Sequence, residues 1–432
     1  RRLCCVGRGS EAFDGRRFER PEEGEELLAF GLIEESVLAG RGSALASVLA
    51  DRVRARVLRI PAANLLIGST HTHSAPDCYA FPDGKGGHTG DLAFMRTLLP
   101  SIERAIGWMH DCGDAKGDGF LSYEKHSARG LVNQGWKDSW DAIMHTDGSL
   151  ATAPVALVEA QGYTYAALTR IGPALDDIGR SDLAREYRRK ADKLRRDFNE
   201  QFWMPESRFY GIAIDGDGRL VQSAASNAGH TLWAGIVEPE RARDVAGRLM
   251  SPELFSGWGI RTLSDTNPRF NPIGYHCGTV WPHDNSIAAF GLKMYGFEPE
   301  LNVLASALFD AATSFEYFRL PELFGGERRL DHGPPVPYPV ACRPQSWAAG
   351  AMPLIMQAVL GLHADAPENR LRIVNAQLPE WLNSVSVKRL RVGDGEVSLQ
   401  YRRDGDRTLV EVNEATDGID VMNSKTWPLV DS

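Results

Sequence analysis

The chain has 432 residues, of which 43% are hydrophobic and 24% are charged, and its formal net charge is −9. This composition supplies a sizeable apolar core and excludes wholesale disorder. Because the basic residues are interspersed with a surplus of acidic ones, the charge pattern argues against a nucleic-acid-binding protein. No apolar run approaches the roughly 18 residues that a membrane span needs, so no membrane partner is expected.

The cysteines and the first residues indicate a compartment. Six cysteines are scattered along the chain without a CxxC pair or a regular framework, which is typical of reduced thiols. The sequence begins RRLCCVGRG and no apolar segment of the signal-peptide kind follows. We therefore expect a cytoplasmic protein.

The first 88 residues differ in pattern from the rest. Residues 1 to about 40 are polar and weakly patterned, residues 42–60 have apolar residues at helical spacing, and LLIGSTH at 65–71 is typical of a short buried strand. The strand would lead into a loop that carries His71 and His73. An H-x-H pair at a strand end is one way to place two imidazoles near a metal.

Amphipathic helices alternate with long loops through the middle of the chain. Residues 91–110 present one broad apolar face. Further helices are expected within 154–178, 181–202, 226–236, 239–250, 275–296, 301–315 and 344–362. Helices joined by short turns favour antiparallel neighbours. Residues 385–412 alternate at period two around Gly-Asp turns, which predicts a small antiparallel sheet.

The densest group of functional residue types is the loop NQGWKDSWDAIMHTDG, residues 133–148. This loop carries Trp136, Lys137, Asp138, Trp140 and Asp141. Indole faces stack on the apolar faces of sugar rings, and carboxylates accept sugar hydroxyls or transfer protons. The stretch therefore favours a carbohydrate site.

Eight motifs, taken in order, carry a resemblance to a known family. They are GDGFLSYE, GLVNQGWKDSWD, EAQGY, SNAGH, LFSGWGIRTL, YHCGTVWPHDN, RLPELFGG and PYPVACRPQSWAA. Residues from about 89 to 412 resemble the bacterial amylo-α-1,6-glucosidase, or glycogen-debranching-like, family of six-hairpin glycosidases. The resemblance implies a mainly α fold, an (α/α)6 toroid, and hydrolysis of α-linked glucosides or oligosaccharides.

A second resemblance covers residues 42–84. The segment IPAANLLIGSTHTHSAPD is similar to the amino-terminal part of neutral ceramidases, in which a histidine of the HTHS motif binds zinc. The other zinc ligands of that family have no matching context here, so we expect no metal at His71 or His73. The two resemblances meet at GGHTGD.

The resemblances divide the chain into three parts. We expect an N-terminal α/β fragment, partly disordered, over 1–88, a toroid domain over 89–378, and a small antiparallel β tail over 379–432. A full toroid has twelve helices, whereas about nine are expected from Asp91 onward. The toroid is therefore predicted to lack its first helices.

Hydrolysis with inversion requires two carboxyl groups about 6.5–9.5 Å apart. Asp138 is the predicted general acid, because partial desolvation between Trp136 and Trp140 would keep it protonated. It also resembles the acid Asp that follows Gly-Trp in related toroid enzymes such as trehalases, although Lys137 shifts the alignment by one and leaves Asp141 as the alternative. Glu322 is the predicted base, since LPELFGG resembles the segment that carries the base in glucoamylase-like enzymes.

Further residues are expected to bind substrate. They are Tyr123, Glu124, Trp136, Lys137, Trp140, Asp141, Gln161, Trp258, His276, Trp281 and Asp284, with His230 a weaker candidate. For Gln161, a structural hydrogen bond explains a buried amide equally well. The expected partner is an oligosaccharide or polysaccharide, and the chemistry requires no metal or organic cofactor.

Two alternatives to an active hydrolase remain open. The first is a catalytically decayed toroid that still binds carbohydrate, because missing helices would disturb the catalytic geometry. The second is a zinc amidase built on His71 and His73.

Overall fold

The computed structural model describes residues 81–82, 88–89, 92–366, 368–393 and 395–428. The helix predicted over 42–60, the strand over 65–71, and both histidines of the H-x-H pair lie outside the described residues. Within the described part, no helix is both long enough and apolar enough to cross a membrane. Cys112, Cys277 and Cys342 form no disulfide.

Helical hairpins recur along the described chain, as the sequence predicts. Helix α4 (Val158–Arg170) continues into α5 (Gly172–Asp177), and both pack against α6 (Ser181–Gln201). Helix α7 (Asn227–Ala234) packs against α8 (Pro239–Leu249), and α9 (Pro282–Met294) packs against α10 (Glu298–Ala312). Proline stands in the first turn of α8, α9 and α10, where its missing N–H costs no intrahelical bond.

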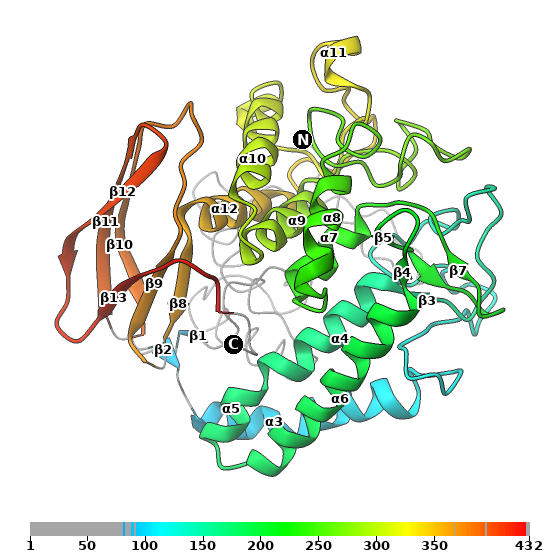
Figure 1. Cartoon of the computed structure of the whole chain (residues 1–432), viewed down its shortest axis with the longest axis horizontal. Coiled ribbons are helices and arrows are strands. Elements are labelled where there is room, and N and C mark those ends of the chain that lie inside the picture. Colours follow the sequence, from blue (N-terminus) through cyan, green and yellow to red (C-terminus); the bar gives the residue numbers. More distant parts are fainter. Residues whose placement is uncertain (1–80, 83–87, 90–91, 367, 394, 429–432) are drawn as a thin grey trace, which may run out of the picture.

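The helices form an inner and an outer row (Figure 1). Helices α4, α7, α9 and α12 (Ser346–Leu360) are neighbours in this order; α6 packs on α4, α8 packs on α7, and α10 packs on both α9 and α12. Every residue of α9 is buried, whereas α8 buries one face only. Helix α3 (Leu92–Asp111) packs against α5. The apolar pattern of each helix thus matches its row.

Helices α7 and α9 approach each other closely because glycine lies at their crossing. A Cβ added at Gly229 would lie 2.6 Å from the Cβ of Ala288, and one added at Gly291 would lie 2.7 Å from the backbone nitrogen of Trp233. Side chains at these positions would push the two inner helices apart.

Two small sheets follow α12 and gather on one side of the helices (Figure 1). The predicted antiparallel sheet is present as β10 (Ser384–Val392), β11 (Gly395–Asp404) and β12 (Arg407–Ala415). The second sheet has the order β13-β9-β8, in which β8 (Leu362–Asp365) is antiparallel and β13 (Asp420–Ser424) is parallel to β9 (Arg370–Val374). This second sheet was not predicted.

The connecting loops contain several short strands and helical turns. They are β1 (Phe81–Pro82), β2 (His88–Thr89), β3 (Ala156–Leu157), β4 (Trp203–Met204), β5 (Phe209–Tyr210), β6 (Ala213–Ile214), β7 (Leu220–Val221), the 3₁₀ turn η2 (Glu316–Phe318) and α11 (Arg329–His332). Long loops precede α4, α9 and α12. Because successive inner helices of such hairpins run in the same direction, these loops meet at one end of the row.

Candidate functional site

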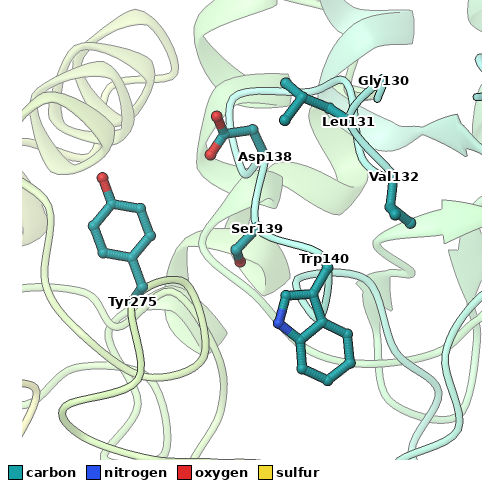
Figure 2. Close-up of a pocket in the computed structure, with 7 residues that line it drawn as sticks. All are labelled: Gly130, Leu131, Val132, Asp138, Ser139, Trp140 and Tyr275. Atoms are coloured by element: carbon teal, nitrogen blue, oxygen red, sulfur yellow. The ribbon is translucent and has the colours of Figure 1, made fainter. Parts of the chain in front are cut away.

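A pocket of about 380 Å³ opens where two of these loops meet. Its lining residues are Gly130, Leu131, Val132, Asp138, Ser139, Trp140 and Tyr275 (Figure 2). All but Tyr275 come from the loop that precedes α4, and Tyr275 comes from the loop that precedes α9. The volume lies within the range of small-molecule sites.

Asp138 is exposed in this pocket, and its carboxylate is turned toward the side where Tyr275 stands (Figure 2). The two neighbouring indoles do not enclose it. Trp136 is 6% exposed and packs its ring against His230 and His283, at centroid distances of 5.7 and 4.9 Å, whereas Trp140 is 62% exposed. The expectation that two indoles desolvate Asp138 is therefore wrong, because the chain turns one of them into the core.

Glu322 is nearly buried and is held by two donors. The Tyr275 hydroxyl donates to Oε1 at 2.9 Å, and the backbone N–H of Cys342 donates to Oε2 at 3.1 Å. Burial raises the pKa of Tyr275 above its ordinary value, and the charge of Glu322, its hydrogen bond and the charge of Asp138 raise it further. Tyr275 therefore stays protonated and donates a hydrogen bond to Glu322. It stands close to both predicted catalytic carboxylates.

Ser139 connects the pocket to a buried imidazole. Its backbone N–H donates to Nδ1 of His276 at 3.4 Å, and its hydroxyl lies 2.9 Å from the same nitrogen. Burial, aided by the charge of Lys137, holds the pKa of His276 well below its ordinary value. Both polar groups of Ser139 therefore lie against one nitrogen of a neutral ring. His276 is thus a support behind the lining, rather than part of it.

Predicted site residues also form a buried polar cluster on the core side of the 136–138 loop. His230 donates to Asp284 Oδ1 at 2.8 Å, and Tyr163 hydrogen-bonds the other ring nitrogen of His230. Lys137 is 1% exposed and donates to the carbonyl oxygen of Thr262 at 2.5 Å. Burial lowers the pKa of Lys137 to about 8, against the opposing charges of Asp284, Glu159 and Cys277.

Glu159, in the first turn of α4, completes this cluster. It is 1% exposed, and burial raises its pKa against the opposing effects of the nearby Asn227 amide and of the charges of His230 and Lys137. The cluster joins the N-terminal parts of α4, α7 and α9. Lys137 and Asp284 are buried and do not line the pocket, so neither side chain is placed to contact a sugar directly in this structure.

Three further predicted residues have structural partners. Gln161 accepts from the N–H of Leu121 at 2.9 Å and donates to the carbonyl oxygens of Leu121 and Leu157 at 2.8 and 2.9 Å. Its amide therefore has the structural role that was the alternative to sugar binding. Trp258 is 8% exposed beneath the guanidinium of Arg329, and Trp281 donates its indole N–H to the carbonyl oxygen of Tyr275 at 2.9 Å.

The remaining predicted residues lie outside the pocket lining. The Tyr123 hydroxyl donates to Asn133 Oδ1 at 2.8 Å. The carboxylate of Glu124 lies 3.7 Å from His126. Asp141 is partly exposed, and its backbone oxygen accepts from the Cys277 thiol at 3.6 Å. Of the residues predicted to bind sugar, Trp140 alone lines this pocket.

The sequence interpretation missed Tyr275, Ser139, Leu131 and Val132. Tyr275 opens the YHCGTVWPHDN motif, and a tyrosine before a cluster of ring residues was a usable signal. The two aliphatic residues gave none, because an apolar residue in a loop is indistinguishable from a core residue until the loop is placed. Among the described residues, no group of three or more His, Cys, Asp or Glu side chains could hold a metal ion.

Comparison with known proteins finds a family and a fold. Residues 83–320 match the family model described as "Mannosylglycerate hydrolase MGH1-like glycoside hydrolase domain". No curated protein matches the chain. A solved sialidase is 12% identical over 77% of this chain and 31% of its own, with a TM-score of 0.56. A GH78 family rhamnosidase of a Bacillus species is 15% identical over 79% of this chain and 32% of its own, with a TM-score of 0.53.

A GH63 mannosylglycerate hydrolase of Thermus thermophilus also matches, at 22% identity over 47% of this chain and 45% of that one, with a TM-score of 0.39. The chain thus spans about a third of the length of the sialidase and the rhamnosidase. These likenesses show the fold. It is a mostly helical domain of the six-hairpin kind with several small sheets, one of them C-terminal.

Proposed function

Because the chain belongs to the family of mannosylglycerate hydrolase MGH1-like glycoside hydrolase domains, we propose that it cleaves a glycosidic bond with inversion, using Asp138 as general acid and Glu322 as general base. One observation supports this assignment above the others. Tyr275 lines the pocket beside Asp138, and its hydroxyl donates a hydrogen bond to Glu322. Two carboxylates from distant parts of the sequence therefore share this tyrosine as a neighbour, which supports the proposal.

Each carboxylate has surroundings that suit its role. Asp138 is open to the pocket, where it can give a proton to the oxygen of the leaving group as the bond to the anomeric carbon breaks. Glu322 is held by hydrogen bonds from the Tyr275 hydroxyl and the Cys342 N–H, which fix the orientation of its carboxyl group. It would take a proton from a water that attacks the anomeric carbon from the opposite face.

The substrate is an α-linked glucoside or oligosaccharide in this proposal, as the resemblance to amylo-α-1,6-glucosidases implies. The family description names a second candidate, mannosylglycerate. A decayed, carbohydrate-binding toroid remains the alternative. It would bind these compounds without cleaving them.

The test is hydrolysis of α-1,4- and α-1,6-linked glucosides, mannosylglycerate and the matching α-glycosyl fluorides, with the first anomer of the product identified by proton NMR. We expect a β-configured product. Asp138→Asn should lose activity on glycosides far more than on the fluorides, because fluoride leaves without a proton from the acid. Glu322→Gln should lose activity on both, typically by about 10²–10⁴-fold.

Retention of configuration, or equal losses for the two variants on both substrate classes, would contradict the assignment of roles. Binding of these compounds by calorimetry with no turnover would establish the decayed toroid instead.

A further inference from the structure

We propose that His276 is a positioning residue for the general acid, and that it acts through Ser139 to fix the direction in which Asp138 faces the pocket. The inference rests on the proposed function, because it takes Asp138 as the acid and Glu322 as the base. His276 is 2% exposed and is not among the residues that line the described pocket. It would therefore affect the reaction without contacting the sugar.

Asp138 depends on its neighbours in the sequence for its direction. Its carboxylate is exposed, and among the described residues none donates a hydrogen bond to it. The backbone on either side therefore sets where the carboxylate points. Lys137 ties one side to the carbonyl oxygen of Thr262 at 2.5 Å, and Ser139 ties the other. Such restraint matters for proton transfer, because a displacement of about 1 Å can lower a rate by about 100-fold.

Three contacts hold Ser139, which lies next to Asp138 on the pocket lining (Figure 2). Its hydroxyl oxygen lies 2.9 Å from Nδ1 of His276, and its backbone N–H donates to the same nitrogen at 3.4 Å. Its carbonyl oxygen accepts from the side-chain amide of Asn133 at 2.7 Å. The backbone that follows the acid is therefore anchored on both sides of the Ser139 Cα.

The imidazole of His276 is the fixed side of this contact. It stacks on the indole of Trp281 at a centroid distance of 4.9 Å, and it meets the rings of Trp136 and Tyr275 edge-on at 5.5 and 4.5 Å. Close packing among these rings leaves the imidazole little freedom, whereas Ser139 belongs to a loop. Loss of the contact should therefore release the loop that carries the acid, rather than the imidazole.

The second nitrogen of the His276 ring argues against a merely structural role. Nε2 is buried and has no hydrogen-bond partner among the described residues. A buried polar atom without a partner costs free energy, and a phenyl ring would fill the same space among aromatic neighbours without that cost. The contact between Nδ1 and Ser139 therefore explains why a histidine stands here.

The same contact relates the acid to the base. Asp138 immediately precedes Ser139, which contacts His276. Tyr275 immediately precedes His276 and donates to Glu322 at 2.9 Å. The acid is thus held relative to the tyrosine that holds the base, and inversion depends on the spacing of the two carboxyl groups.

The experiment compares an alkyl α-glycoside with the α-glycosyl fluoride of the same sugar, chosen as the one whose fluoride the protein hydrolyses best. Ser139→Ala should lower kcat for the alkyl glycoside at least tenfold and leave KM within threefold. For the fluoride kcat should stay within threefold, because fluoride leaves without a proton from the acid. An equal fall on both substrates would indicate a disturbed base, and a change confined to KM would indicate direct contact between Ser139 and the sugar. Either result would overturn the inference.

His276→Phe removes both contacts to Ser139 while keeping a ring. Its kcat for the alkyl glycoside should fall at least as far as that of Ser139→Ala, and the double variant should fall no further than His276→Phe. Its melting temperature should match or exceed that of the parent, because the buried Nε2 is gone. Multiplied losses in the double variant would show that the two residues act separately, which contradicts the inference.

Two variants make the result independent of how His276→Phe folds. Ser139→Thr keeps a hydroxyl and should keep kcat within threefold of the parent, whereas a loss as large as that of Ser139→Ala would count against the contact. Ser149 is the matched control, because it is exposed in the same loop and its hydroxyl donates to Oδ1 of Asp147 at 2.6 Å. Ser149→Ala should change neither kcat nor the ratio between the substrates by more than threefold.

Failure of the inference and failure of the proposed function give different results. If Asp138→Asn loses activity on the glycoside but Ser139→Ala and His276→Phe do not, the positioning role is wrong and the hydrolase proposal stands. If the parent hydrolyses neither substrate, the hydrolase proposal is wrong. Hydrogen exchange then still tests the contact, since peptides that cover residues 133–141 should exchange faster in both variants, and unchanged exchange would overturn the inference.

Discussion

Tyr275→Phe removes one oxygen atom from the centre of the site while keeping its ring. In the parent, the Tyr275 hydroxyl donates a hydrogen bond to Oε1 of Glu322 at 2.9 Å. In the variant this bond is lost, and the hydrogen bond from the N–H of Cys342 to Oε2 remains. A hydrogen bond to a charged group contributes about 1.5–3 kcal/mol. If the bond orients the base during proton transfer, its loss should lower kcat by roughly 10- to 150-fold.

The division of the loss between kcat and KM separates orientation of the base from a merely structural effect. A hydrogen bond that acts during proton transfer should, when lost, lower kcat and leave KM nearly unchanged. The measurement is steady-state hydrolysis of an α-glycosyl fluoride at a fixed pH.

Tyr338→Phe is the matched control. The Tyr338 ring lies 5.7 Å from the Tyr275 ring between centroids, and its substitution removes the same atom without touching the bond to Glu322. We expect less than about a threefold change in kcat and in KM. A kcat of Tyr275→Phe within threefold of the parent would refute the role given to this tyrosine.

Three further predictions follow from the same geometry. Azide should restore activity to Glu322→Gln, because it replaces the attacking water and gives a β-glycosyl azide from an α-glucoside, which NMR detects. If Glu322→Gln keeps more than about a tenth of the parent rate without azide, Glu322 is not the base. The free energy of unfolding of the parent, relative to that of Lys137→Met, should rise as the pH increases from about 8, the native pKa of Lys137, to its ordinary value of 10.5. In this range the unfolded chain holds a proton that the native lysine has released. Urea unfolding should show that the difference rises by up to about 1.4 kcal/mol per pH unit, and a flat or falling difference would contradict the prediction. Gly229→Ala should destabilise the fold by about 1–3 kcal/mol, because its Cβ would lie 2.6 Å from the Cβ of Ala288. Gly247→Ala on α8, where nothing lies within 4 Å of the added Cβ, should be neutral or stabilising. Equal changes in melting temperature for the two variants would contradict this prediction.

The helices could be predicted because their signals are local. Apolar spacing, proline in the first turn and glycine after the last turn, as at Gly235 and Gly361, locate α7, α8, α10 and α12 within a few residues. The alternation over 385–412 gave the sheet of β10, β11 and β12 for the same reason. The parallel pairing of β13 with β9 could not be predicted, because it joins segments separated by that whole sheet.

The site was harder because a loop motif does not show which of its side chains face solvent. Within three consecutive residues, Trp136 and Lys137 are buried and Asp138 is exposed. All three are plausible sugar ligands by residue type, and no periodicity exists in a loop to separate them. The roles proposed for Asp138 and Glu322 remain predictions that the variants above test.

The order in which the strands of the second sheet appear along the chain has a consequence for synthesis. Strand β9 is central in the order β13-β9-β8, and it carries the buried side chains Leu371, Ile373 and Val374. Its partner β13 is made only after β10, β11 and β12. While the ribosome adds those strands, β9 presents an unpaired edge, the kind of surface that pairs with other chains. A substitution that keeps β13 from pairing once it is made, such as Val421→Pro, should leave this edge of β9 exposed after synthesis and increase aggregation.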